Sequence, residues 1–460
     1  MMLDAFRDLG AALSRFTERW IPDSWVICMI LTSVALVLSV LGAGASPAQA
    51  VFAWGDGVWV LLELAMQFTL AMVAAHACVS SRPAYRLLDR LASLPNPERP
   101  HQALLVAALF SLATAYLNWA LCLVACALFV PFLCRRNPKV DVRVLVAASY
   151  LGLGTLWHGG LSGSAPLILA TPGNPLLAPQ SGPPVVTRLY PVTETLFQPW
   201  NLVIVLVVSA VAVAVCIALH PRRGAVTLTP EQVAAILPSP PEALAEPVTP
   251  GGRIDAFRGW TWLAALLLAA PLGFAIATRG FGTSWTINAY NAVFLATALV
   301  LHGRPLAFLR ACRAGLDSAW GIIVQFPFYA GIFGVMQNTG LGRWLETLFV
   351  GLATRESYPA IVYCYTAVVN FFVPSAGSKW LIEAPYLIGA GEQLGVSVVS
   401  VLLPYTYGDS TTNLIQPFFA IPMLAVTRLR FGDVVGYTFL VAVACFATTL
   451  VAMALIPTDL

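Results

Sequence analysis

The sequence consists mainly of long apolar stretches separated by short polar segments. Windows of roughly 20 nearly uncharged residues recur, at Ser24 to Ala45, Asn201 to Leu219, Trp260 to Ala277, Tyr290 to Leu301 with its flanks, and Val434 to Ile456. A helix of this length crosses a hydrocarbon layer about 30 Å thick. The pattern therefore predicts an all-α, polytopic membrane protein.

The composition supports this prediction and narrows the function. Of the 460 residues, 58% are hydrophobic and 10% are charged, whereas soluble domains average about 25% charged residues. The net charge of +3 does not indicate nucleic acid as a partner, because arginines of membrane proteins report orientation. The nine cysteines are scattered through apolar segments, so packing explains them better than a metal site.

The first 23 residues do not read as a cleavable signal peptide, because several charged residues precede a first apolar run that is too long. Their apolar residues instead fall near one helix face: Leu3, Phe6, Leu9, Leu13, Phe16 and Trp20. We expect residues 1–23 to form an interfacial helix that leads into the first span.

The basic residues assign the polar segments to two sides of the membrane. With the N-terminus in the cytoplasm, most of the 25 Lys and Arg residues fall in cytoplasmic loops if two apolar stretches enter and return as re-entrant hairpins. One hairpin covers 103–133, with its tip at Leu117 to Leu121, and the other covers 359–395, with its tip at VPSAGSKW. The chain then has nine spans and an external C-terminus.

Each hairpin is followed by a span that small polar residues interrupt, near 158–166 (HGGLSGSAP) and near 407–413 (YGDSTTN). The two units have opposite orientations in the membrane. A Pro- and Ala-rich cytoplasmic linker at 222–258 joins the first half, 24–221, to the second half, 259–460. Inverted repeats with broken helices at the midplane are the architecture of secondary transporters.

Charged residues at the depth of the second hairpin and break are candidates for function. Lys379 and Glu383 are one helical turn apart, so they could simply neutralise each other. Charge at this depth is costly, so Lys379 is also a candidate for the substrate or ion path and Glu383 for a proton carrier. Asp409 suits Na⁺ or H⁺, although it could also cap the half-helix that follows. His158 could relay protons, bond substrate or simply pack.

Two enzyme interpretations find little support. The tetrapeptide GLSG at 160–163 matches a short pattern of membrane serine proteases, but the second half offers only His302 as a base, at the end of a span. Asp317 and Asp409 could suggest a two-aspartate protease, but Asp317 lies near a predicted helix end. We expect that the chain is not an enzyme, and a membrane receptor is a further alternative to transport.

Six ordered motifs resemble the bacterial short-chain fatty acid transporter family of the ion transporter superfamily. They are WGDGVWVLLELAMQ at 54–67, LNWALCLV at 117–124, SGSAPLILATPGNP at 162–175, QFPFYAGIFGVM at 325–336, NFFVPSAGSKW at 370–380 and YGDSTTNLIQPF at 407–418. The resemblance covers nearly the whole chain. It implies uptake of small monocarboxylates such as butyrate or acetoacetate, driven by an H⁺ or Na⁺ gradient and carried by an elevator-type core.

The resemblance and the intramembrane charges together give the candidate site. The substrate-binding candidates are Asn118, Trp119, Ser162, Ser164, Thr171, Asn174, Ser375, Ser378, Lys379 and Asn413. The ion-coupling candidates are Asp409, Glu383 and His158. No metal site or cofactor is expected apart from Na⁺ as a coupling ion, and the expected partners are a small carboxylate and membrane lipid, without nucleic acid.

The resemblance further implies a homodimer in the bacterial inner membrane. The second hairpin departs from the family, because its tip reads SAGSKW instead of a glycine-rich SGGGHW type and because Glu383 takes an uncharged position. This tip is closer to those of dicarboxylate and basic-amino-acid carriers in the superfamily. A dicarboxylate or amino-acid transporter is therefore the alternative function.

Overall fold

The chain folds as an all-helical, multi-pass membrane protein. The computed structural model describes residues 19, 22, 24–179, 183–221, 223–241, 246, 248–373, 375–416 and 420–460, and no strand occurs among them. Seven helices in these ranges are long and apolar enough to cross a membrane. The N-terminal helix expected at 1–23 lies outside the described residues, apart from positions 19 and 22.

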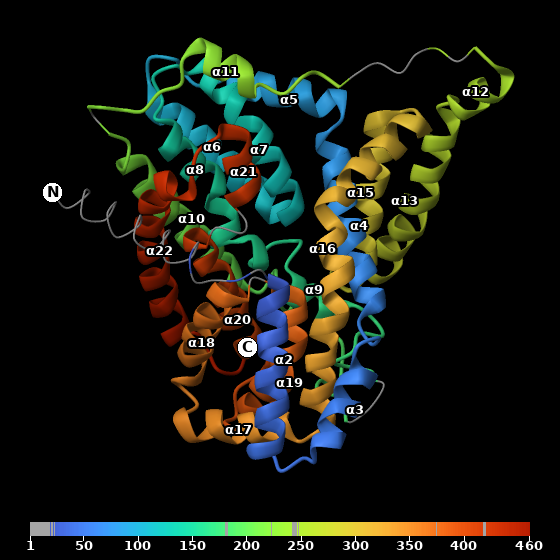
Figure 1. The fold of residues 1–460 in the computed structure, drawn as a ribbon, viewed down its shortest axis with the longest axis vertical. Helices are drawn as coiled ribbons and strands as arrows, with labels where there is room; N and C mark the ends of the chain where they lie inside the picture. The colour runs from blue at the N-terminus through green and yellow to red at the C-terminus, as the bar shows by residue number, and fades with distance from the viewer. Residues whose placement is uncertain are drawn as a thin grey trace.

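The first helices connect the two ends of the molecule (Figure 1). α2 (Ser24–Leu41) runs toward the end that holds α3 (Pro47–Gly57), α4 (Leu62–Val79) returns from it, and α5 (Arg82–Ala92) lies across the opposite end. Ser46 and Ser81 start α3 and α5, because each hydroxyl accepts a backbone N–H of the first turn.

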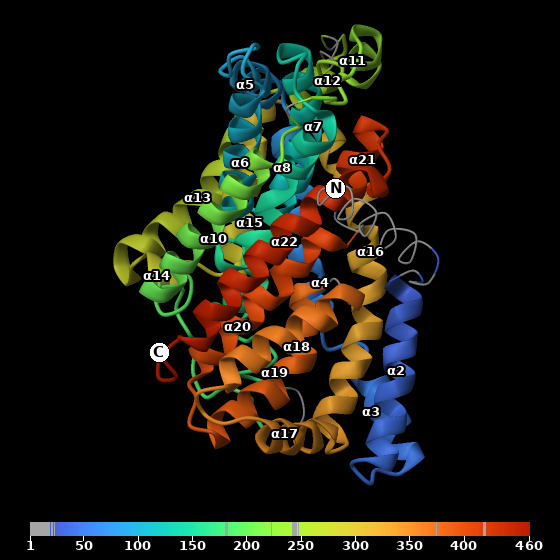
Figure 2. The same ribbon diagram turned by 90° about the vertical axis from the view of Figure 1, so that its left-hand side faces the viewer.

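The first helical hairpin turns back at Asn118, inside the LNWAL segment. It consists of α6 (Pro100–Leu117) and α7 (Trp119–Arg136). Asn118 Oδ1 accepts the N–H groups of Ala120 at 2.9 Å and Leu121 at 3.0 Å, so this residue both ends α6 and caps α7. Figure 2 shows both arms extending from this turn toward the end that holds α5.

The helix after this hairpin is interrupted where the small polar residues cluster. α8 (Val142–Thr155) is followed by the 3₁₀ turn η1 (Trp157–Gly159) and by α9 (Ser164–Ala170), with a bend of 43° between the two parts. α8 packs closely on α6 because Gly152 has no side chain: a methyl group there would lie 2.3 Å from the carbonyl oxygen of Ser111.

The middle of the chain connects the two halves and supplies the longest helix. Its helices are α10 (Pro199–Ala218), α11 (Pro230–Ile236), α12 (Pro250–Asp255), α13 (Gly259–Arg279), α14 (Phe281–Ser284), α15 (Ile287–His302) and α16 (Pro305–Asn338). α16 packs against α2, α3 and α4. The expected linker at 222–258 thus contains two short helices, and the backbone of Val226 bonds to that of Val142.

The second half contains a hairpin that enters from the opposite end (Figure 1). The helices are α17 (Leu341–Leu352), α18 (Tyr358–Phe372), α19 (Ala376–Gln393), α20 (Val398–Thr411), the 3₁₀ turn η2 (Thr412–Ile415), α21 (Ile421–Thr427) and α22 (Phe431–Ala454). α18 packs on α20 at Gly408, where a methyl group would lie 2.6 Å from the carbonyl oxygen of Tyr363. The contact corresponds to that between α6 and α8.

The second interruption begins later than the expected 407–413. α20 continues through Thr411, because the hydroxyls of Ser410 and Thr411 bond back to carbonyl oxygens one turn earlier, at 2.9 and 2.8 Å. Their polar groups are satisfied within the helix, so they do not break it. Asp409 therefore lies inside α20, and its expected alternative role as the cap of the following half-helix is wrong.

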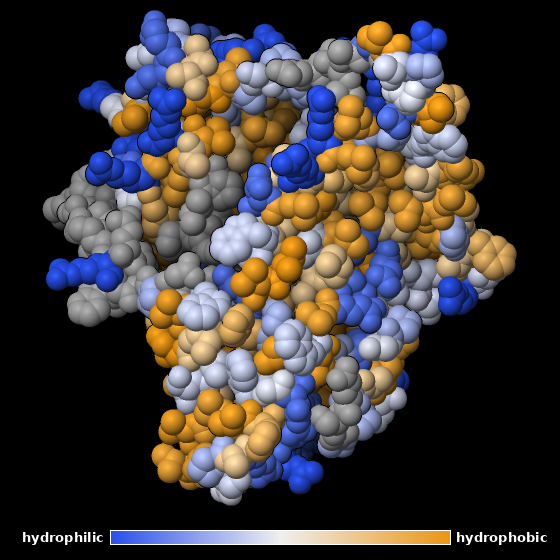
Figure 3. All heavy atoms as spheres, turned by 45° about the vertical axis from the view of Figure 1, so that its right-hand side comes forward, coloured by the Kyte–Doolittle hydropathy of each residue, from blue (hydrophilic) through white to orange (hydrophobic). Residues whose placement is uncertain are grey.

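The outer surface has the character of a membrane protein. Figure 3 shows hydrophobic residues spread across the face that carries α13, α15 and α16. On α13 the exposed residues include Trp260, Trp262, Leu266, Leu267 and Phe274. In a membrane, lipid tails would cover such residues.

Candidate functional site

Three ionisable side chains from three segments meet in the interior. Lys379 Nζ on α19 lies 2.7 Å from Asp409 Oδ1 on α20, and His158 Nδ1 in η1 lies 3.2 Å from Asp409 Oδ2. None of the three residues is more than 2% exposed. Both oxygens of the Asp409 carboxylate are therefore paired, one with a cation and one with an imidazole.

The hydrogen bonds around His158 indicate which ring nitrogen carries its proton. The backbone N–H of Ala165, in the first turn of α9, donates to His158 Nε2 at 3.0 Å. Because Nε2 accepts, the ring proton is on Nδ1, which donates to Asp409. The ring also stacks on Trp157, with centroids 4.6 Å apart. His158 is thus a neutral imidazole that connects the first helix break to Asp409.

Asn370, at the end of α18, joins the charged pair to the second helix break. Its Oδ1 lies 3.4 Å from Lys379 Nζ. Its amide nitrogen donates to the Asp409 carbonyl at 2.5 Å and to Asn413 Oδ1 at 2.9 Å. The Asn413 amide in turn donates to the Leu153 carbonyl on α8 at 3.0 Å. The two broken helices are therefore connected through side-chain amides.

Glu383 does not form the ion pair with Lys379 that its spacing suggested. Its Oε1 accepts a hydrogen bond from Tyr365 at 3.2 Å, and the hydroxyls of Tyr365 and Tyr386 are 2.7 Å apart. Its Oε2 is buried and has no hydrogen-bond partner among the described residues. Lys379 pairs with Asp409 instead, because the packing of α19 on α20 brings that carboxylate within reach.

A cavity of about 580 Å³ adjoins this cluster. On one side it is lined by residues of the hairpin tips and helix breaks, including Trp119, Ser164, Ser375 and Asn413. On the other side it is lined by α4 and α16, with Phe68, Met72, His76, Trp320 and Phe326. The cavity extends from the hairpin tips toward the end of the molecule that holds α5, since His76 lies in the last turn of α4.

Only part of the predicted substrate site lines the cavity. Trp119, Ser164, Ser375 and Asn413 do so. Ser162 accepts the Trp119 N–H at 3.0 Å, and Thr171 accepts the Ile287 N–H at 3.1 Å. Their hydroxyls therefore hold backbone segments together.

The remaining predicted substrate residues also have local bonds. Asn118 caps α7, Asn174 accepts the Leu176 N–H at 3.1 Å, and the Ser378 hydroxyl lies 2.5 Å from that of Ser375. Lys379 is two residues beyond Gly377, which lines the cavity, but its ammonium points to Asp409. The charged cluster therefore lies behind the cavity wall.

Sequence reasoning missed several residues of the site. Asn370 is the first residue of the motif NFFVPSAGSKW, but nothing in the sequence distinguishes it from other amide side chains; only its contacts do. Tyr365 and Tyr386 have no sequence signal beyond being polar in an apolar helix. His76 lines the cavity from α4, and its buried Nδ1 has no hydrogen-bond partner in the described ranges.

The first turn of α19 borders the cavity without a cap. Ser375, Ala376 and Gly377 line the cavity, and the Ser375 side chain makes no capping hydrogen bond. A helix N-terminus carries partial positive charge and free N–H groups, which attract an anion. In contrast, the N-terminus of α7 at the other tip is capped by Asn118. The cavity therefore has one end suited to a carboxylate and largely apolar walls.

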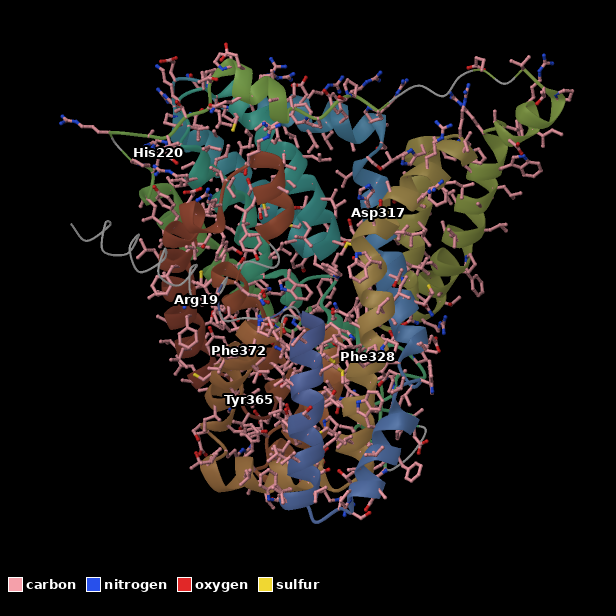
Figure 4. The ribbon with its side chains drawn as sticks, in the orientation of Figure 1. Arg19, His220, Asp317, Phe328, Tyr365 and Phe372 are labelled. Atoms are coloured by element: carbon pink, nitrogen blue, oxygen red, sulfur yellow. The ribbon has the colours of Figure 1, made fainter. Side chains whose placement is uncertain are left out.

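Asp317 lies in a different half of the molecule from the residues around Glu383 (Figure 4). Tyr365, which bonds Glu383, lies in the half of the molecule that holds α17, whereas Asp317 lies on α16 in the half that holds α5. This position gives no support to the interpretation of Asp317 and Asp409 as a two-aspartate protease.

A family model described as "Short chain fatty acid transporter" matches residues 5–456. The chain belongs to this family. Two relatives of the chain are each named "Putative short-chain fatty acid transporter". The one from Escherichia coli (strain K12) is 34% identical over 425 residues, which cover 92% of this chain and 94% of the relative. The one from Haemophilus influenzae is 31% identical over 428 residues, with the same coverage of 92% and 94%.

Two solved transporter structures share the fold. The YdaH transporter of Alcanivorax borkumensis aligns with a TM-score of 0.60 and 14% identity, covering 94% of this chain and 98% of that one. MtrF of Neisseria gonorrhoeae aligns with a TM-score of 0.59 and 14% identity, covering 96% and 97%. Its title describes a class of antimetabolite efflux pumps. At this identity the likeness concerns the fold alone, and membership in a transporter family speaks against an enzyme.

Proposed function

We propose that the chain is a secondary active transporter that takes up short-chain fatty acids or similar small carboxylates, such as butyrate or acetoacetate, together with H⁺ or Na⁺. The family and the names of the two relatives support this proposal. The observation that carries it is the cavity, which combines apolar walls with the uncapped N-terminus of α19.

The two parts of a short-chain fatty acid match the two parts of this cavity. The short acyl chain would contact Trp119, Phe68 and Phe326, which are among its lining residues. The carboxylate would accept N–H groups from the first turn of α19, where the helix dipole favours negative charge. Because Lys379 is already paired with Asp409, it offers no free cation to a second carboxylate, so a monocarboxylate fits better than a dicarboxylate.

The proposal includes an elevator-type movement of one part of the protein against the other. The moving core would contain the inverted repeats formed by α6–α9 and α18–α21. Its coherence is supported by the bonds from Trp119 to Ser162 and from Asn413 to Leu153. The remaining wall of the cavity, α4 and α16, would belong to the scaffold, through which the chain would form a homodimer. The membrane would be the bacterial inner membrane, with the N-terminus in the cytoplasm.

The test is uptake of labelled butyrate and labelled succinate into proteoliposomes, with protein-free liposomes to correct for diffusion of the neutral acid. We expect saturable butyrate uptake and none of succinate. Uptake of succinate alone would contradict the monocarboxylate proposal. Uptake of neither substrate would contradict both monocarboxylate and dicarboxylate transport.

A matched pair of variants tests whether the cavity is the site. Gly321 lines it, whereas Gly273 lies on the exposed surface of α13 with no heavy atom within 4 Å of an added Cβ. Gly321→Trp should abolish saturable butyrate uptake by filling the cavity, and Gly273→Trp should not. Equal uptake by both variants would place the substrate elsewhere.

A further inference from the structure

The buried cluster has one more acidic group than it has cations. Lys379 supplies one positive charge, whereas Asp409 and Glu383 supply two carboxyl groups, and His158 is neutral because its Nε2 accepts a hydrogen bond. All four residues are at most 3% exposed. Isolated charge at such depth is strongly unfavourable. The cluster therefore holds one proton on its two carboxyl groups.

The surroundings of Glu383 show which carboxyl group holds that proton. The titratable groups that face it are Tyr365 on α18, Tyr386 and Lys379 on α19, and Asp409 and Tyr405 on α20. Lys379 is the one cation among them, and its ammonium is on Asp409. Glu383 Oε2 and Asp409 Oδ1 both lack a hydrogen-bond partner in the described part of the chain. Asp409 Oδ1, however, has the Lys379 ammonium at 2.7 Å, and Glu383 has no such ion pair there. In this conformation Glu383 is the protonated acid and Asp409 the carboxylate.

The position of the Lys379 ammonium is one that a bound cation would take. It lies between Asp409 Oδ1 and Asn370 Oδ1, at 2.7 and 3.4 Å, beside the interruption that follows α20. Transporters bind Na⁺ beside the broken ends of helices, and carboxylate and side-chain amide oxygens are ligands that hard cations prefer. Here a covalently attached ammonium already neutralises the carboxylate, and it would repel a second cation from the same oxygens.

Building on the transport function proposed above, we propose that Lys379 acts as a built-in cation in place of Na⁺ and that Glu383 carries the coupling proton, so that transport is driven by H⁺ and does not require Na⁺. The proton step breaks the O–H bond of Glu383 and releases the proton to water on one side of the membrane. The carboxylate that remains is one helical turn from Lys379, whose ammonium can pair with it. A proton taken up from the other side re-forms the O–H bond, and Lys379 returns to Asp409.

The first experiment uses the wild-type protein in proteoliposomes loaded with choline salts. Counterflow of labelled butyrate at equal pH, without Na⁺, measures substrate exchange independently of any driving ion. We expect counterflow in these conditions, accumulation when a pH gradient is imposed, and no accumulation from a Na⁺ gradient at equal pH. Protein-free liposomes correct for diffusion of the neutral acid, and a protonophore should abolish the protein-dependent accumulation.

These measurements distinguish the two proposals. Absence of counterflow with or without Na⁺ would overturn the transport function itself. Counterflow that requires Na⁺, or accumulation driven by a Na⁺ gradient, would leave transport standing and overturn the roles of Lys379 and Glu383.

A matched pair of variants tests the proton carrier. Glu383→Gln keeps the shape of the protonated acid but cannot release a proton, so it should retain counterflow and lose pH-driven accumulation. Glu392→Gln makes the same change at an exposed position of α19 and should retain both. Accumulation by Glu383→Gln at the wild-type level would overturn the proposal.

Lys379→Gln tests the built-in cation. With the ammonium removed, the Asp409 carboxylate and the Asn370 oxygen lack their positive charge and become available to Na⁺. We expect Na⁺ to stimulate counterflow in this variant but not in the wild type. Counterflow of Lys379→Gln that does not respond to Na⁺ would overturn the assignment of Lys379.

Discussion

At the scale of single residues, the chain stabilises buried carboxylates in different ways according to their position. Asp409, in the interior, is held by a lysine and a neutral histidine. Asp141, at the N-terminus of α8, is held by Arg143, with Oδ2 2.6 Å from the guanidinium, and by the backbone N–H of Val226 at 2.8 Å. Asp141 lies outside the membrane-spanning segments, so its carboxyl group can exchange protons with the aqueous solution.

Asp141 should make the stability of the protein depend on acidity. Burial alone would raise the pKa of its carboxyl, but the hydrogen bonds from Arg143 and Val226 hold that pKa below its usual range. The stabilisation is therefore complete above the unfolded pKa of about 3.9 and is lost as pH falls through the lower pKa of the folded state.

Asp141→Asn should lower the free energy of unfolding by about 1–3 kcal/mol near neutral pH, with a smaller difference from wild type in acid. Melting temperatures in detergent across this pH range measure it. Asp89→Asn removes two ion pairs at the partly exposed surface, with Arg135 and Arg136, and should have a smaller effect. A difference for Asp141→Asn that is independent of pH would contradict the prediction.

The sequence identified the charged members of the site but not their partners. Lys379, Glu383 and Asp409 stand out because charge is rare in apolar segments. The choice between Glu383 and Asp409 as the partner of Lys379 depends on how α18, α19 and α20 pack, and helical spacing alone favoured Glu383. Asn370 and Tyr365 became recognisable only through the atoms that they contact.

At the scale of elements, close helix contacts at glycine position both broken helices. Gly152 brings α8 against α6, and Gly408 brings α20 against α18. In the second case the contact also sets the position of Asp409, the next residue. The packing of α20 on α18 is therefore directly coupled to the geometry of the charged cluster.

Gly408→Ala should destabilise the protein by about 1–3 kcal/mol, because the new methyl group would overlap the Tyr363 carbonyl unless the helices separate. Its melting temperature in detergent should fall, and transport should fall with it. Gly273→Ala on α13 meets no atom within 4 Å and should leave both unchanged. Equal melting temperatures for the two variants would show that α20 can shift without cost.

The two helix breaks differed in how well sequence located them. The first occurs where Gly159, Gly160 and Gly163 are concentrated, since glycine weakens a helix. The second begins after Thr411, because hydroxyl side chains can be satisfied inside a helix by bonding to the preceding turn. Glycine content was therefore the better guide.

At the scale of the whole molecule, the cavity lies between the hairpin tips and the pair α4 and α16. Its lining includes Ser318 on α16, an exposed residue in the half that holds α5. The opposite end of the molecule carries α3, whose exposed N-cap is Ser46. The two serines therefore lie toward opposite ends of the molecule.

Ser318→Cys should react with a membrane-impermeant thiol reagent from the side that holds α5, which the proposed orientation places in the cytoplasm. Ser46→Cys should react from the other side. Labelling of whole cells and of inside-out vesicles measures this, and the wild-type chain gives the background of the native cysteines, seven of which are buried. Labelling of both variants from the same side would contradict the orientation of the cavity.

The sequence by itself determined the all-helical membrane character, the family and the charged residues around which the site is built. These properties follow from local composition and ordered motifs. A span must be apolar wherever it lies, and a charge within a span is so costly that it marks a structural or functional role. Tertiary structure decided the pairing of Lys379 with Asp409, the hydrogen bond of Glu383 to Tyr365 in place of an ion pair with Lys379, and which polar residues line the cavity. These depend on contacts between residues far apart in the chain, which local pattern does not encode.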